Sequence, residues 1–164
     1  MAGRISTDAF KPVRIGRLGQ RVVVGIDGRY DLISRSAIPA QWAAYGARPG
    51  YDHGMVMDGA YGVCHTAAAD GSFGYLCGMQ LSKGERVPDG LASITVPSGN
   101  YAKFACPGHI SEMAHQWERI YAEWQPGSGY EITDGPSVEF YGADFDPATG
   151  SGGFEIWVPV RKTT

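Results

Sequence analysis

The chain has 164 residues, of which 43% are hydrophobic and 19% are charged, and it carries a formal net charge of -3. This length suits one domain that buries a core without disulfides or structural metal. No apolar run is long enough to span a membrane, no secretory signal is present, and the scattered lysines and arginines do not favour direct binding to nucleic acid.

The first part of the chain is predicted to be extended. Residues 1–12 carry no periodicity and are expected to be a flexible terminus. Between residues 13 and 32, the β-branched run at 22–24 predicts a strand, and Gly-Arg-Tyr at 28–30 predicts a bend in it.

A helix is predicted next. Ser36 is the expected N-cap, and Pro39 is tolerated in the first turn. The helix ends near Gly46, and its apolar face consists of Ile38, Trp42 and Tyr45.

A hairpin and a further extended region follow this helix. Residues 61–66 and 73–81 have strand character, and Asp70-Gly71 marks the turn between them. After a polar connector at 83–90, residues 91–104 are again predicted to be extended, with an interruption at 97–100.

The last third of the chain predicts a second helix and a second hairpin. Ser111 is the expected N-cap, and Pro126-Gly127 ends the helix. Residues 137–142 and 154–160 form the hairpin. The apolar stripe of the helix consists of Met113, Trp117, Ile120, Tyr121 and Trp124.

Strand, helix and hairpin therefore occur twice. Trp42 is echoed by Trp117 and Phe73 by Phe154, at an offset of roughly 75 to 80 residues, which indicates an internal duplication. We predict one α+β domain over residues 13–161, with a first repeat at about 13–82 and a second at about 91–161. The two pseudo-symmetric strand-helix-strand-strand repeats form an antiparallel sheet with both helices on one face and a ligand groove between the halves.

Five segments along the chain are characteristic when taken together: Gly-Ala-Tyr-Gly-Val-Cys at 59–64, Phe-Gly-Tyr-Leu-Cys-Gly at 73–78, Val-Pro-Ser-Gly-Asn-Tyr-Ala-Lys-Phe at 96–104, Gly-Pro-Ser-Val-Glu-Phe-Tyr at 135–141 and Phe-Glu-Ile-Trp-Val-Pro-Val at 154–160. In this order they resemble the gyrase-inhibitor-like (GyrI-like) small-molecule-binding family, which includes effector-binding domains of AraC- and MerR-type multidrug regulators. The resemblance spans about residues 13 to 161. It points to a stand-alone member without the DNA-binding region of the regulators.

Strand alternation in the second hairpin separates two sets of side chains. We expect Val138, Phe140, Phe154, Ile156 and Val158 to pack beneath the second helix, and Glu139, Tyr141, Glu155 and Trp157 to face the groove or solvent. A carboxylate flanked by aromatic rings suits a lipophilic cation. The resemblance also implies a ligand-binding carboxylate on the penultimate strand, at Glu139 in Glu-Phe-Tyr, while Glu155 is a second candidate.

Residues of the first half complete the predicted groove. Tyr30, Tyr61, Tyr75 and Tyr101 are candidate walls, although aromatic residues in strands are often core. The small residues Gly62, Cys64, Gly74 and Gly78, together with Leu76, would line a face that leaves volume for a ligand. Glycines needed only for bends are the alternative explanation.

Metal, cofactor and nucleophile motifs are not found. The four histidines, His53, His65, His109 and His115, lack HxxxH or HExxH spacing, and the glycines form no phosphate-binding loop, so we expect neither metal nor cofactor. Three cysteines, Cys64, Cys77 and Cys106, form no CxxC pair and indicate free thiols in a cytoplasmic protein. Ser111 lies in no nucleophile-elbow pattern.

The sequence leaves three functions open. The preferred hypothesis is a monomeric or weakly dimeric protein that sequesters or senses hydrophobic, cationic or aromatic compounds. The resemblance also allows a cofactor-independent hydrolase of cyclopropane-containing, DNA-alkylating natural products, in which Glu139 or Glu155 would polarise water and Tyr141 or another tyrosine would orient the leaving oxygen or carbonyl. Inhibition of a topoisomerase is the third and last possibility.

Overall fold

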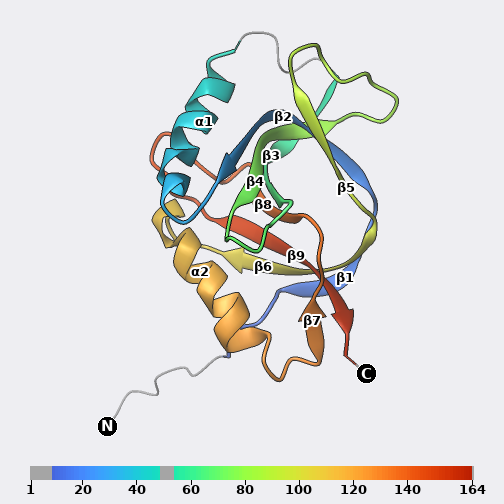
Figure 1. Ribbon diagram of the computed structural model, residues 1–164, viewed down its shortest axis with the longest axis vertical. Helices are drawn as coiled ribbons and strands as arrows, with labels where there is room; N and C mark the ends of the chain where they lie inside the picture. Colours follow the sequence, from blue (N-terminus) through green and yellow to red (C-terminus); the bar gives the residue numbers. More distant parts are fainter. Residues whose placement is uncertain (1–8, 49–53, 164) are drawn as a thin grey trace.

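The computed structural model describes residues 9–48 and 54–163 (Figure 1). Residues 1–8 of the expected flexible terminus, and His53, lie outside the described residues. Within the described part, nine strands form one sheet: β1 (Arg14–Leu18), β2 (Arg21–Tyr30), β3 (Met55–His65), β4 (Phe73–Leu81), β5 (Ala92–Val96), β6 (Gly99–Cys106), β7 (Tyr130–Ile132), β8 (Ser137–Tyr141) and β9 (Phe154–Lys162).

The sheet is antiparallel and its strand order reflects the duplication. The order is β1-β6-β9-β8-β3-β4-β2-β5, with β7 added beside β9. The halves β6-β9-β8 and β3-β4-β2 therefore meet at the central pair β3–β8, and their orders mirror each other. Each half also receives the strand that precedes the other half in sequence, because β1 pairs with β6 and β5 pairs with β2. The predicted α+β fold is confirmed.

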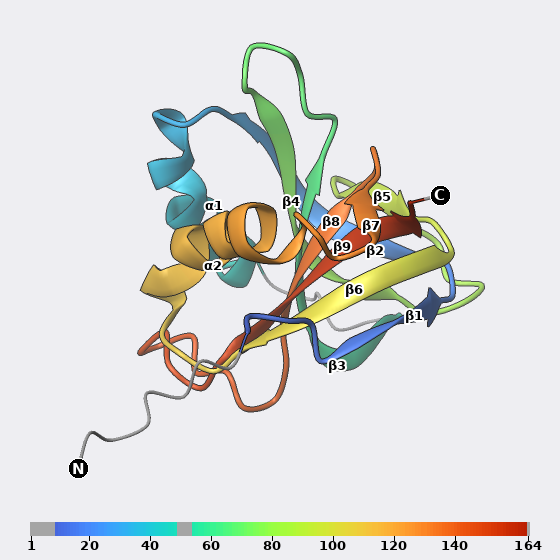
Figure 2. The ribbon, with the colours of Figure 1, turned by 90° about the horizontal axis from the view of Figure 1, so that it is seen from below.

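Two helices cover one face of this sheet (Figure 2). The first, α1 (Ile38–Gly46), ends at the predicted residue and carries Pro39 in its first turn. The second, α2 (Met113–Arg119), continues as a π-helical turn from Ile120 to Trp124. A π-helical turn inside a helix is rare and is frequently found at functional sites.

Both predicted N-caps are wrong. A short 3₁₀ turn precedes each helix, and the Ser36 hydroxyl bonds the carbonyl of Ile33 instead of capping α1. Before α2, Nδ1 of His109 accepts a hydrogen bond from the backbone N–H of Ser111 at 3.1 Å. The imidazole therefore serves as the capping acceptor that we had assigned to the Ser111 side chain.

The core lies in two layers, one on each face of the sheet. On the helix side, Phe104, Ile120, Trp124 and Ile156 are buried together. On the other side, buried residues of strands from both halves meet in one cluster, which consists of Val23, Tyr61, Val63, Leu76, Val96, Tyr101, Val138 and Trp157. The sheet therefore curves, so that its two halves share a core on the face without helices.

The second hairpin corrects one prediction. Alternation holds within each strand, but β8 and β9 pair Val138 with Trp157 and Glu139 with Ile156. Glu139 and Ile156 consequently face the helices, whereas Val138, Trp157 and Glu155 face the opposite side. Because side chains alternate with a period of two, a register one residue away from the expected one exchanges the faces of a whole strand.

Two further details differ from the sequence prediction. The first extended segment breaks between Leu18 and Arg21, where β1 ends and β2 begins, and β2 runs through the expected bend at 28–30. The short strand β7 was not predicted, because three residues are too few for a periodic signal.

Candidate functional site

A buried carboxylate lies at the centre of the helix-covered face. Glu139 belongs to β8, which lies between β3 and β9, and only 7% of the residue is exposed. Its neighbour across the strand pair is Gly62 of β3. A charged side chain rarely reaches such burial without hydrogen-bonding partners.

Three aromatic side chains supply those partners. The hydroxyls of Tyr75 and Tyr141 donate to Oε1 of Glu139 at 2.8 and 3.2 Å. Nε1 of Trp117 on α2 donates to Oε2 at 3.3 Å. Nε1 of Trp42 on α1 donates to the Tyr75 hydroxyl at 3.0 Å. Each helix therefore contributes one indole to a network that is centred on the sheet.

Burial dominates the electrostatics of this network. It raises the pKa of Glu139, although the hydrogen bonds from Tyr75, Trp117 and Tyr141 act in the opposite direction. Burial and the nearby carboxylate together hold the pKa values of the Tyr75 and Tyr141 hydroxyls well above their usual range. Both tyrosines are therefore protonated donors at neutral pH.

The carboxylate faces an open recess between the two helices and the sheet. The recess has a volume of about 2540 Å³ and extends beyond the helices to residues 93–95 and 132–137. Its aromatic rings include the stacked pair Trp117 and Tyr121, whose centroids lie 6.2 Å apart, and Trp42, which lies edge-on to Tyr141 at 5.5 Å. Ring faces and edges of this kind suit a hydrophobic ligand.

Two small residues of β3 make room beside the carboxylate. A Cβ at Gly62 would lie 2.1 Å from the hydroxyl oxygen of Tyr75 and 3.1 Å from Oε1 of Glu139. The absence of a side chain at this position therefore lets Tyr75 reach Glu139. Cys64 also lines the recess, and burial, together with the nearby Glu139, raises the pKa of its thiol well above the usual range.

The structure brings together some of the predicted site residues and separates the others. Glu139, Tyr141 and Tyr75 meet as described above. Tyr30 lies beside α1, where its hydroxyl bonds the side chain of Gln41. The remaining predicted residues, Tyr61, Leu76, Tyr101, Glu155 and Trp157, lie on the opposite face of the sheet.

On that opposite face, Trp157 belongs to a packed and charged cluster. Its indole donates to Oε1 of Glu155 at 2.8 Å, and Nζ of Lys103 lies 4.1 Å from its ring centroid. Only 3% of Trp157 is exposed, so its ring is not available to a ligand. The prediction that Glu155 shares a face with Glu139 is wrong, because of the register described above.

The two tryptophans of the network were not among the predicted site residues. The helical periodicity of Trp42 and Trp117 indicated core positions, and both are partly buried. The sequence nevertheless contained a signal for a shared role of Trp42 and Trp117, because these two residues occupy equivalent places in the two repeats. A polar N–H on a ring at such a buried interface normally requires an acceptor.

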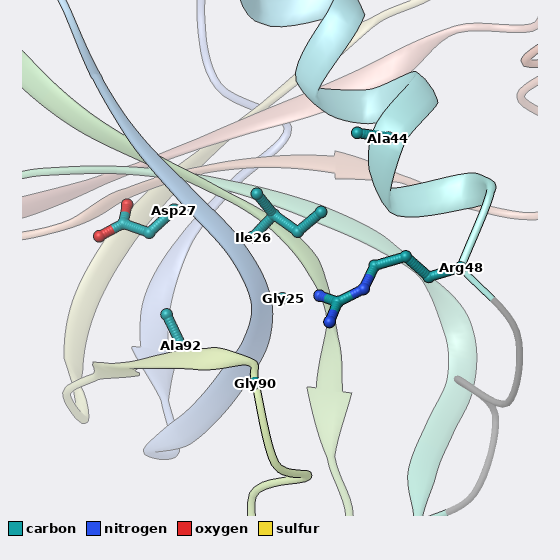
Figure 3. A pocket seen from close by; sticks show the side chains of 7 residues that line it. All are labelled: Gly25, Ile26, Asp27, Ala44, Arg48, Gly90 and Ala92. Carbon is teal, nitrogen blue, oxygen red and sulfur yellow. The ribbon is translucent and has the colours of Figure 1, made fainter.

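A second recess, of about 490 Å³, is lined by residues 25–27 of β2, by Ala44 of α1 and by Arg48, Gly90 and Ala92 (Figure 3). Its charged side chains are Arg48 and Asp27, and Oδ1 of Asp27 lies 2.8 Å from Nε2 of His65. None of its seven lining residues is aromatic. The aromatic recess at Glu139 is therefore the better candidate for an organic ligand.

The described part of the chain contains no helix that is both long and apolar enough to cross a membrane.

The chain is an effector-binding domain of the GyrI-like class, because residues 14–160 match a family model of such domains. More particularly, the model is that of the Cass2 family of integron-associated effector binding proteins, and the chain belongs to this family.

Two curated relatives match part of the chain. The transcriptional regulator BrlR of Pseudomonas aeruginosa is 28% identical over 102 residues, which cover 62% of this chain and 37% of the regulator. A DNA gyrase inhibitor of Erwinia billingiae is 28% identical over 74 residues, which cover 45% of this chain and 47% of the inhibitor. The matched region spans less than half the length of either relative.

Solved structures share the fold over nearly the whole chain. An integron cassette protein of Vibrio cholerae superposes with a TM-score of 0.66 at 17% identity, covering 93% of this chain and 98% of the other. SAV2435, solved bound to tetraphenylphosphonium, superposes with a TM-score of 0.64 at 21% identity, covering 90% and 93%.

Proposed function

We propose that this protein binds a hydrophobic organic cation in the recess, with Glu139 as the counter-ion. The observation that carries the proposal is the buried carboxylate of Glu139, whose donors Tyr75, Tyr141 and Trp117 are all neutral. The hydrogen bonds spread the negative charge but do not cancel it. Among the described residues, none of the side chains that hydrogen-bond Glu139 is cationic, and a ligand cation in the recess would supply the opposite charge.

The aromatic walls support the same ligand chemistry. Ring faces attract positive charge, and the attraction grows when the cation leaves water. Tyr121 is 52% exposed at the mouth of the recess, while Trp117 reaches inward to Glu139. A cation with apolar substituents would contact these rings on its way to the carboxylate.

Similar proteins support the assignment. The chain belongs to an effector-binding family, and one protein of the same fold has been solved with tetraphenylphosphonium, a lipophilic cation. We infer that the protein either sequesters such compounds or senses them for a partner.

Calorimetric titration with tetraphenylphosphonium tests the proposal. Glu139→Gln keeps the size of the side chain and removes its charge, so we expect affinity to fall by at least about tenfold. Glu155→Gln is the matched control, because it makes the same change on the opposite face and should bind as the wild type does. Equal affinity of the wild type and Glu139→Gln would contradict the proposal.

A second candidate function is hydrolysis of a strained electrophile, such as a cyclopropane-containing natural product. It is favoured by the two tyrosine hydroxyls that donate to Oε1 of Glu139, since they hold the carboxylate in place while its other oxygen could polarise an attacking water. Mass spectrometry of a bound electrophile separates the two functions: turnover indicates hydrolysis, and an unchanged ligand indicates binding.

A further inference from the structure

The protein itself fills most of the hydrogen-bonding capacity of Glu139. An ionised carboxylate offers about four lone-pair sites. Oε1 accepts from both Tyr75 and Tyr141, and Oε2 accepts from Trp117. About one site, on Oε2, is therefore left for a ligand.

The donors that occupy Oε1 are held in place by their surroundings. Tyr75 is 1% exposed, and its hydroxyl also accepts a hydrogen bond from Trp42. The ring of Tyr141 packs against Phe145 at 4.8 Å and against Phe154 at 6.3 Å. Neither tyrosine can release the carboxylate without repacking its neighbours or leaving a buried hydroxyl unpaired.

The same count applies to the rest of the recess floor. The Tyr75 hydroxyl is already an acceptor for Trp42. The thiol of Cys64 is only a weak acceptor, and its pairing partner across β3 and β8, Ser137, adds one hydroxyl to the recess lining. A ligand group whose several N–H donors lie against Glu139 would therefore lose hydrogen bonds to water on entry and regain only part of them.

We propose that the recess selects permanent cations without N–H donors, such as quaternary ammonium and phosphonium ions, over primary amines and guanidines. This inference rests on the proposed function, because it assumes that the cation lies beside Glu139. A primary ammonium brings three donors to a carboxylate with about one open site, whereas a quaternary cation needs only charge and ring faces.

A matched pair of ligands tests the selectivity. We would compare (4-phenylbenzyl)trimethylammonium with 4-phenylbenzylammonium at pH 7, where both are cationic, by calorimetry. For the wild type we expect the quaternary ion to bind about tenfold more tightly, which corresponds to one unpaired donor. Tyr141→Phe frees a site on Oε1, so the ratio of the two affinities should fall severalfold.

The two ligands also differ in intrinsic hydrophobicity, but this difference is the same for the wild type and the variant. It therefore cancels when the ratio of affinities in the variant is compared with the ratio in the wild type. Tyr61→Phe is the matched control, since it deletes a tyrosine hydroxyl on the opposite face and should leave the ratio unchanged. Tyr75→Phe is a second variant that frees the same oxygen and should lower the ratio as Tyr141→Phe does.

The outcomes separate this inference from the proposed function. Equal affinities in the wild type, or a ratio that Tyr141→Phe and Tyr75→Phe leave unchanged, would overturn the selectivity while cation binding stands. Failure of both cations to bind the wild type would overturn both.

Discussion

Replacing Gly62 with alanine should disconnect Tyr75 from Glu139. The added Cβ would lie 2.1 Å from the hydroxyl oxygen of Tyr75 and 2.7 Å from its Cζ, both far inside van der Waals contact. Tyr75 is 1% exposed and cannot move into solvent. The ring must therefore shift within the core, and its 2.8 Å hydrogen bond to Glu139 must break or lengthen.

The magnitude follows from three terms. A hydrogen bond to a charged group contributes about 1.5–3 kcal/mol, and overpacking a core typically costs about 1–3 kcal/mol. Alanine in a strand recovers about 0.5–1 kcal/mol relative to glycine. We therefore expect Gly62→Ala to lower the free energy of unfolding by about 2–5 kcal/mol, or the melting temperature by at least about 5 °C for a chain of this size.

Thermal denaturation followed by tryptophan fluorescence measures this effect, and titration with tetraphenylphosphonium measures its consequence for binding. Gly99→Ala is the matched control, because Gly99 is also in a strand and no heavy atom lies within 4 Å of a Cβ built there. If Gly62→Ala melts and binds as Gly99→Ala does, the close approach of Tyr75 to Glu139 has no energetic role and the reasoning is refuted.

Three further predictions concern the pH dependence of stability, the hydrogen bonds that attach α1 to the sheet, and the N-cap before α2. The pKa of Glu139 is raised in the folded state, so the wild type should gain stability relative to Glu139→Gln as pH falls from neutral toward the ordinary glutamate value of 4.5, and its cation binding should weaken. Denaturation of both proteins at several pH values measures the difference in their free energies of unfolding. A difference that does not change with pH would contradict this prediction. Gln41→Leu removes two hydrogen bonds, at 2.7 and 2.8 Å, to backbone carbonyls of β2 and β4, and should cost about 1–3 kcal/mol in urea unfolding. His109→Ala should cost about 1 kcal/mol by the same measurement and Ser111→Ala less, and the reverse order would restore the serine as the cap.

The helices and hairpins were predictable because each has a local signal. The spacing of Ile38, Trp42 and Tyr45 predicted α1, and its end at Gly46 is confirmed. Strand character in 61–66 and 73–81 predicted the hairpin of β3 and β4. The repeated order of these elements also indicated the duplication that the strand order of the sheet displays.

The caps and the register were not predictable in the same way. Ser111 is a favoured N-cap residue, but the nearby ring of His109 supplies the acceptor, and its Nε2 lies 2.7 Å from the distant carbonyl of Thr149. Similarly, alternation predicted which residues of β9 share a face with Glu155, but it could not predict which residues of β8 share that face. The pairing of Phe140 with Glu155 decided this, and it places Glu155 on the face opposite to Glu139.

The sequence by itself determined the α+β class, the two repeats and the candidate carboxylate Glu139, because periodicity, turn residues and family motifs are local properties of the chain. Only the tertiary structure decided that Tyr75, Tyr141, Trp117 and, through Tyr75, Trp42 join that carboxylate while Glu155 lies on the opposite face. The physical reason is that strand register and helix docking bring together residues up to 64 positions apart, and no short-range pattern encodes those distances.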